Sequence, residues 1–140
     1  LSLIDYWETF YFKDILNKNI SGCDPDYMLR EISQNVVSAF KNKKNIFLAE
    51  LEFWSLSNHD KDVRNRIKVL YVRLLDLFKS IINKGIENKI YKKLNVEVAA
   101  LSIMTSLQGV IWFSIFEDSS ISAEEYVNDV MEFIIFGFKK

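Results

Sequence analysis

The residue types that most often perform catalysis or bind metals are scarce in this sequence. It contains one histidine, His59, and one cysteine, Cys23, so it has neither a histidine-rich metal site nor a Cys–His pair of familiar spacing. The motifs of phosphate-binding loops, nucleophile elbows and zinc proteases do not occur. Glu50 and Glu52 are two residues apart on a predicted helix and therefore face different directions, which excludes a carboxylate pair. We expect no enzyme activity, no bound metal and no cofactor.

Aromatic side chains are the more informative feature. The chain has 11 Phe, 6 Tyr and 3 Trp, and these come from several different predicted helices. If several of them converge, they line an apolar pocket in which Gln108, Thr105 or Tyr71 supplies orienting hydrogen bonds. The candidates are Trp7, Phe10, Tyr11, Phe47, Trp54, Tyr71, Phe78, Trp112 and Phe116. The alternative is that the same side chains fill a packed core. An enzyme, by contrast, would need a cluster of titratable groups that only folding brings together.

The amino-acid composition limits which fold classes can position these residues. The 140 residues fit one domain, 1–140, and 49% of them are hydrophobic, which excludes disorder. Only 4 Gly and 1 Pro are present, so turns are few and helices are favoured over sandwiches and barrels. A net charge of −1 provides no strong attraction to nucleic acid or to an anionic membrane. A lone cysteine indicates an intracellular protein.

Helical periodicity predicts an all-α protein of about six helices and no strand. The expected helices cover residues 2–18, 24–40, 45–57, 60–88, 95–116 and 122–137. Their starts carry capping signals: Asp24 before Pro25, Asp60, and Ser122 with Glu125 as a capping box. We expect the fourth helix to end near Asn88 in a left-handed cap, with Gly85 as the alternative stop.

The fifth predicted helix carries no charge from residue 98 to 116. That length meets the criterion for a membrane span, but its serines, Thr105 and Gln108 make insertion marginal, so we favour a buried helix and no membrane. Ser102, Ser106 and Gly109 form a small-residue face that lets another helix approach closely. Pairing the last two helices of two chains into a four-helix bundle would bury these apolar surfaces. A large monomeric core is the alternative.

The order of several short segments resembles the C-terminal regulatory domain of TetR-family transcriptional regulators. The resemblance runs from residue 47 to the end, and Asp24-Pro25 with Leu29 resembles the family's usual entry into this domain. The segments are residues 47–51 (FLAEL) followed by Trp54, 62–64 (DVR), 84–88 (KGIEN), 95–101 (NVEVAAL) and 107–110 (LQGV). In the family the long helix often ends Gly-x-x-x-Gly, and Asn88 stands near the second glycine.

The resemblance implies a cytoplasmic homodimer held by the last two helices and a cavity for a small hydrophobic or amphipathic effector. Residues 1–19 resemble the helix that connects to an N-terminal helix-turn-helix domain, which is absent from this chain and through which alone DNA would be bound. The expected ligand-binding residues are Phe10, Leu51, Trp54, Tyr71, Leu74, Phe78, Gln108 and Trp112. The expected dimer-interface residues are Ser102, Ser106, Gly109, Phe113, Tyr126, Val130, Phe133, Ile134 and Gly137.

The leading hypothesis is therefore an effector-sensing and dimerisation domain of a TetR-like regulator. Effector binding would shift the dimer and so control DNA binding by the missing N-terminal domain. The alternative hypothesis is a helical protein-interaction module whose aromatic stripes bind a partner helix, without a ligand cavity.

Overall fold

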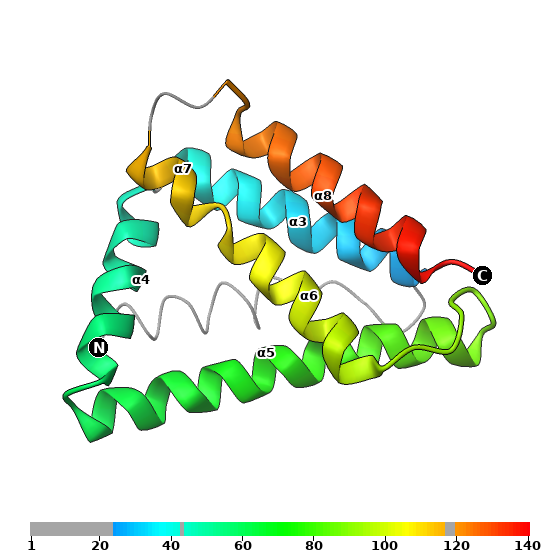
Figure 1. The fold of residues 1–140 in the computed structure, drawn as a ribbon, viewed down its shortest axis with the longest axis horizontal. Coiled ribbons are helices and arrows are strands. Elements are labelled where there is room, and N and C mark those ends of the chain that lie inside the picture. The colour runs from blue at the N-terminus through cyan, green and yellow to red at the C-terminus, as the bar shows by residue number, and fades with distance from the viewer. Residues whose placement is uncertain (1–23, 43, 117–119) are drawn as a thin grey trace.

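The computed structural model describes residues 24–42, 44–116 and 120–140, and these form helices and connections without a strand. The all-α prediction is thus confirmed for the part of the chain described. The helices, labelled as in Figure 1, are α3 (Pro25–Asn42), α4 (Lys44–Ser57), α5 (Lys61–Glu87), α6 (Val96–Gln108), α7 (Ile111–Ile115) and α8 (Ala123–Phe138). The predicted helix at 2–18, with Phe10, lies outside the described residues.

The helices pack around one core in a simple arrangement. α3 and α8 lie side by side, α5 runs along the opposite edge, and α6 crosses between them (Figure 1). α4 joins α3 to α5 and packs against both α5 and α7. The predicted stripe of α3 is confirmed as core, since Leu29, Ile32 and Val36 are buried. They meet Phe78 and Ile82 of α5 in one apolar cluster, whose removal from water stabilises the fold.

The predicted helix starts are confirmed by their capping hydrogen bonds. The Asp60 carboxylate accepts from the N–H groups of Asp62 and Val63, at 2.9 and 3.3 Å. The Ser122 hydroxyl accepts from the N–H of Glu125 at 3.0 Å. Each cap satisfies donors that have no partner inside the helix.

The end of α5 lies where the sequence predicts it, but its geometry differs. Asn88 has a φ of −84°, and the left-handed residue is the next one, Lys89, with a φ of 60°. The chain reverses there because the Gly85 carbonyl accepts two N–H groups, from Ile90 and Tyr91, both at 2.9 Å. A Cβ on Gly85 would lie within 3.0 Å of the Tyr91 ring. Gly85 is therefore needed for the close approach of Tyr91 and not as a helix stop.

The predicted continuous helix at 95–116 is wrong, because the chain breaks between α6 and α7. The Val110 N–H bonds to the Leu107 carbonyl at 3.2 Å, in the tighter three-residue pattern, instead of to Ser106. The Ser106 carbonyl accepts the Tyr126 hydroxyl at 2.6 Å. The same carbonyl also accepts the Gly109 N–H at 3.2 Å, so α6 ends in one short-range backbone bond and one contact from α8. Periodicity along a single helix does not predict the contact from α8.

In the described residues, one stretch, Val96–Phe113, is long and apolar enough to be a candidate membrane span, and a third of it is buried. This is weak evidence for a span, since core helices of soluble proteins meet the same criterion. The stretch includes the α6–α7 break and contacts α5 and α8 through α6. We interpret it as a core helix of a helical domain.

Substituting Gly85 tests the close approach of Tyr91. We expect Gly85→Ala to lower the free energy of unfolding by about 2 kcal/mol, because the added methyl group overpacks a buried ring. Ser80→Ala, at an exposed position of α5, is the control: stability should stay the same or rise by up to about 0.5 kcal/mol, since alanine favours a helix slightly more than serine. Urea unfolding at one protein concentration measures both. Equal stability of Gly85→Ala and wild type would contradict the assignment.

Candidate functional site

A cavity of about 220 Å³ lies where α4 approaches α7. It is lined by Leu51 and Trp54 from α4, Gln108 from the end of α6, and Ile111 and Trp112 from the α7 segment. Four of these five residues are among the ligand-binding residues predicted from the sequence. Ile111 was not predicted; it faces the cavity because the chain turns between α6 and α7.

The other predicted ligand-binding residues lie elsewhere on the fold. Phe78 is buried in the core, Leu74 is half-buried against that core, and Tyr71 is exposed on α5. None of the three is among the residues lining the cavity. Phe10 lies outside the described residues. The structure thus brings together the predicted residues from α4 and α6–α7, and it places those from α5 mostly in packing roles.

The cavity has an apolar lining with one polar side chain. Gln108 is half-buried, and its amide makes no hydrogen bond with any of the described residues. The indole rings of Trp54 and Trp112 are 44% and 63% exposed. The Trp112 ring stacks on Phe116, with ring centroids 5.8 Å apart and planes 12° apart. The described lining residues suit binding of an uncharged molecule, and none of them is a group for acid–base chemistry.

Part of the predicted dimer face points to solvent. On α8, Phe133 is 74% exposed and Gly137 lies in open space, while Val130 and Ile134 are half-buried. Phe136, which was not predicted, is 83% exposed beside them. Adjacent exposed phenylalanines of this kind usually mark a surface that another apolar surface covers.

The α6–α7 part of the predicted face contacts α8 of the same chain. Tyr126 organises this contact: its hydroxyl donates to the Ser106 carbonyl, and its ring lies 5.4 Å from that of Phe113. A Cβ on Gly109 would lie 2.5 Å from the Tyr126 oxygen. Burial raises the pKa of the Tyr126 phenol, so its hydroxyl stays protonated and donates. The Ser102 hydroxyl donates to the Ala99 carbonyl at 2.7 Å.

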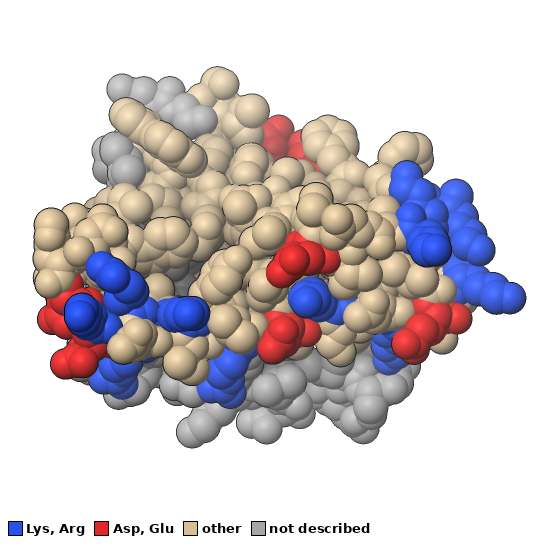
Figure 2. Space-filling model, turned by 60° about the horizontal axis from the view of Figure 1, so that its bottom comes forward, with Lys and Arg blue, Asp and Glu red and all other residues tan. Residues whose placement is uncertain are grey.

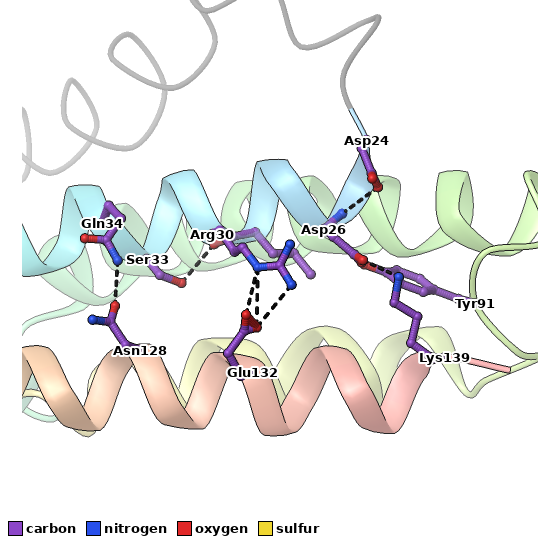
Figure 3. Close-up of polar contacts among 10 residues, drawn as sticks. Asp24, Asp26, Arg30, Ser33, Gln34, Tyr91, Asn128, Glu132 and Lys139 are labelled. Atoms are coloured by element: carbon purple, nitrogen blue, oxygen red, sulfur yellow. Dashed lines mark hydrogen bonds and ion pairs between the residues drawn. The ribbon is translucent and has the colours of Figure 1, made fainter.

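A buried polar cluster of Asp26, Tyr91 and Lys139 ties three parts of the fold together (Figure 3). The Tyr91 hydroxyl donates to Asp26 Oδ1 at 2.6 Å, and the Lys139 ammonium pairs with Oδ2. Both Asp26 and Tyr91 are buried. Burial and the Asp26 carboxylate raise the pKa of Tyr91 well above its ordinary value of 10. These groups satisfy one another, and we interpret the cluster as structural. Neither its burial nor its pairing was predicted.

Two exposed pairs continue this link along α3 and α8. Arg30 makes two-pronged hydrogen bonds of 2.9–3.3 Å to the Glu132 carboxylate, and Gln34 donates to Asn128 at 2.6 Å (Figure 3). Exposed pairs of this kind add little stability, but they define the register of the two helices. The register sets which side of α8 carries Phe133 outward.

Basic side chains gather at one end of the molecule (Figure 2). This end holds Lys89, Lys92 and Lys93 from the α5–α6 connection, and Lys139 and Lys140 after α8. The Lys92 N–H donates to the Phe138 carbonyl at 2.9 Å, which brings the two segments together. Cations beside the carboxyl ends of α5 and α8 offset the partial negative charge of those ends. A stabilising role therefore accounts for this basic end.

Comparison with known protein families matches residues 25–135 to the C-terminal domain of BetI-type transcriptional repressors. The match covers all of α3 to α7 and most of α8. No curated protein and no solved structure matches the chain. Among the described residues, no group of three His, Cys, Asp or Glu side chains is arranged to hold a metal ion.

The Tyr91–Asp26 hydrogen bond predicts a dependence of stability on alkaline pH. The folded state holds the Tyr91 proton after the unfolded chain begins to release it near pH 10, so stability is present below that pH and falls above it. We expect the stability difference between wild type and Tyr91→Phe to shrink by about 1 kcal/mol between pH 10 and 11. Urea unfolding of both proteins at pH 10 and pH 11 measures this difference. Parallel curves would contradict the role of this hydroxyl.

Proposed function

Because the chain belongs to the family of C-terminal domains of BetI-type transcriptional repressors, we propose that it is the effector-sensing and dimerisation domain of a transcriptional regulator. Regulators of the TetR family generally act as dimers that bind DNA and small effectors. One observation carries the proposal for this chain: the α6–α7 segment both lines the cavity and packs, through Gly109 and Phe113, against α8. A molecule in the cavity therefore contacts the element that supports the exposed apolar face.

The proposed dimer forms through α6–α7 and α8 of two copies. Phe133 and Phe136 of α8 and Val98 of α6 would leave solvent together in such an interface. Gly137 favours close approach of a second helix, since its Cα has open space in front of it. The four helices of two copies would then form a bundle, in which apolar faces that one chain leaves exposed cover each other.

Effector binding would act by a shift between two arrangements of this dimer. An effector that binds one arrangement better than the other changes their populations by its difference in affinity. DNA contact would belong to a domain outside these 140 residues, in keeping with the near-neutral charge of this chain. The role is regulatory and not catalytic, and its place is the cytoplasm, without attachment to a membrane.

Charge on the exposed face tests the dimer. We expect wild type to show twice the monomer mass at micromolar concentration. Phe133→Asp should be monomeric, with the dissociation constant of the dimer raised by roughly 100-fold or more, because the new charge would be buried in the interface without a partner. The matched control is Val69→Asp on α5, an exposed apolar residue on the edge of the fold opposite α8 (Figure 1). Light scattering measures the mass. A monomeric wild type, or a dimeric Phe133→Asp, would overturn the dimer.

Bulk at Gly137 gives a second test that does not depend on charge. A Cβ at Gly137 has open space around it, so Gly137→Leu should fold normally and still lose the dimer. Gly109→Leu would be a poor choice, because the new side chain would collide with Tyr126 and disturb the monomer itself. A dimeric Gly137→Leu variant would exclude close helix approach at this position.

A further inference from the structure

We infer that the cavity between α4 and α7 binds a neutral, flat aromatic molecule of one or two rings that carries an amide-like group. This inference rests on the proposed function and names the class of effector. It depends on the size of the cavity, on its two indole rings and on the Gln108 amide, which has no hydrogen-bonding partner among the residues the structure describes.

The volume of the cavity limits the number of rings in the ligand. A dry protein cavity of roughly 150 Å³ is enough to hold benzene. The cavity here, at about 220 Å³, leaves room for a second fused ring or a short substituent, and its open side permits a little more. A long acyl chain or a large multi-ring compound would extend into solvent over much of its surface.

The two tryptophans set the preferred shape. Trp54 comes from α4 and Trp112 from α7, so aromatic surface is supplied from two separate elements. Both rings keep a large exposed fraction, and stacking on Phe116 supports the Trp112 ring from one side. A flat aromatic ligand gains stacked or edge-to-face contacts with such rings, and a saturated ring of the same size does not.

Gln108 sets the polar group. Its side-chain amide offers both a donor and an acceptor, and neither is used by the described residues. A ligand amide or lactam presents the complementary acceptor and donor side by side, so it satisfies both. The other lining side chains are apolar, so a charged ligand would lose its hydration without finding an opposite charge among them.

Isothermal titration calorimetry on the wild-type chain tests this class with four probes. Quinolin-2-one, a two-ring aromatic lactam, should bind measurably. Three matched compounds should bind at least roughly tenfold more weakly. The first is the fully saturated two-ring lactam, which lacks aromatic faces. The second is quinoline-2-carboxylate, which is charged, and the third is tetramethylammonium, a cation that aromatic faces attract. If any of these three binds as tightly as quinolin-2-one, the inferred class is overturned.

Variants locate the binding. Trp112→Leu should raise the dissociation constant of quinolin-2-one by about threefold to tenfold, because a stacked aromatic contact is lost. Gln108→Leu should raise it by about tenfold, since the lactam would lose its hydrogen-bonding partner. Tyr27→Leu, an exposed aromatic residue on α3, is the matched control and should leave it unchanged. Unchanged affinity in the two cavity variants, with their thermal unfolding as in wild type, would overturn the site.

The outcomes separate this inference from the proposed function. Decanoate, a molecule with a long acyl chain, serves as a fifth probe. If decanoate binds, with affinity lost in Trp112→Leu, and quinolin-2-one does not, sensing stands and the aromatic class is overturned. If no probe binds and light scattering still shows the dimer, the inference is overturned and dimerisation alone survives. If quinolin-2-one binds a monomeric chain, the inference is supported and the dimer is overturned.

Discussion

The packing of the described helices depends on one buried carboxylate. Asp26, in the first turn of α3, would be costly to bury alone, and it is tolerated because Tyr91 and Lys139 reach it from the α5–α6 connection and from the end of α8. The Tyr91 ring can come close enough only because residue 85 has no side chain. Three distant parts of the chain are thereby held at one end of the molecule. Removing Tyr91 or Lys139 would leave part of the buried Asp26 carboxylate without a partner, so the three groups depend on one another.

The functional features follow from that anchored end. With α8 held against α3, the opposite side of α8 is left to solvent, and there Phe133 and Phe136 are exposed. Tyr126, near the start of α8, reaches across to Ser106 and Gly109, where α6 ends. The turn that results directs Ile111 and Trp112 toward α4 and so completes the wall of the cavity. The exposed face and the cavity are thus two sides of one contact between α8 and the α6–α7 segment.

Local chemistry explains what could be predicted from the sequence. Asp60 and Ser122 act within three residues of themselves, and the structure confirms both as helix caps. The α6–α7 break could not be predicted in this way. It lies where the Tyr126 hydroxyl, 20 residues away, donates to the Ser106 carbonyl, and helical periodicity does not reveal a contact of that kind. The Asp26 cluster was missed for the same reason, since Tyr91 lies in a connection and resembles any polar-tipped aromatic residue. Trp54 and Trp112 were predicted to share a site, and both line the cavity. Phe78 was predicted to lie there too, but it lies in the core, because its position depends on how α5 is rotated against α3.

The ion pair between Asp26 and Lys139 also bears on how the chain acquires its structure. Its two partners are 113 positions apart, and the bond from the Lys92 amide to the Phe138 carbonyl closes at the same end. On the ribosome, α3 through α7 can form with the Tyr91 hydroxyl already donating to one Asp26 oxygen, while the other oxygen still keeps its water. Docking of α8 must wait until residue 139 has left the exit tunnel, and only then is that water expelled. Closure of this end is therefore a late, long-range step, which makes the nascent chain dependent on protection of its apolar α3 surface until synthesis has passed α8.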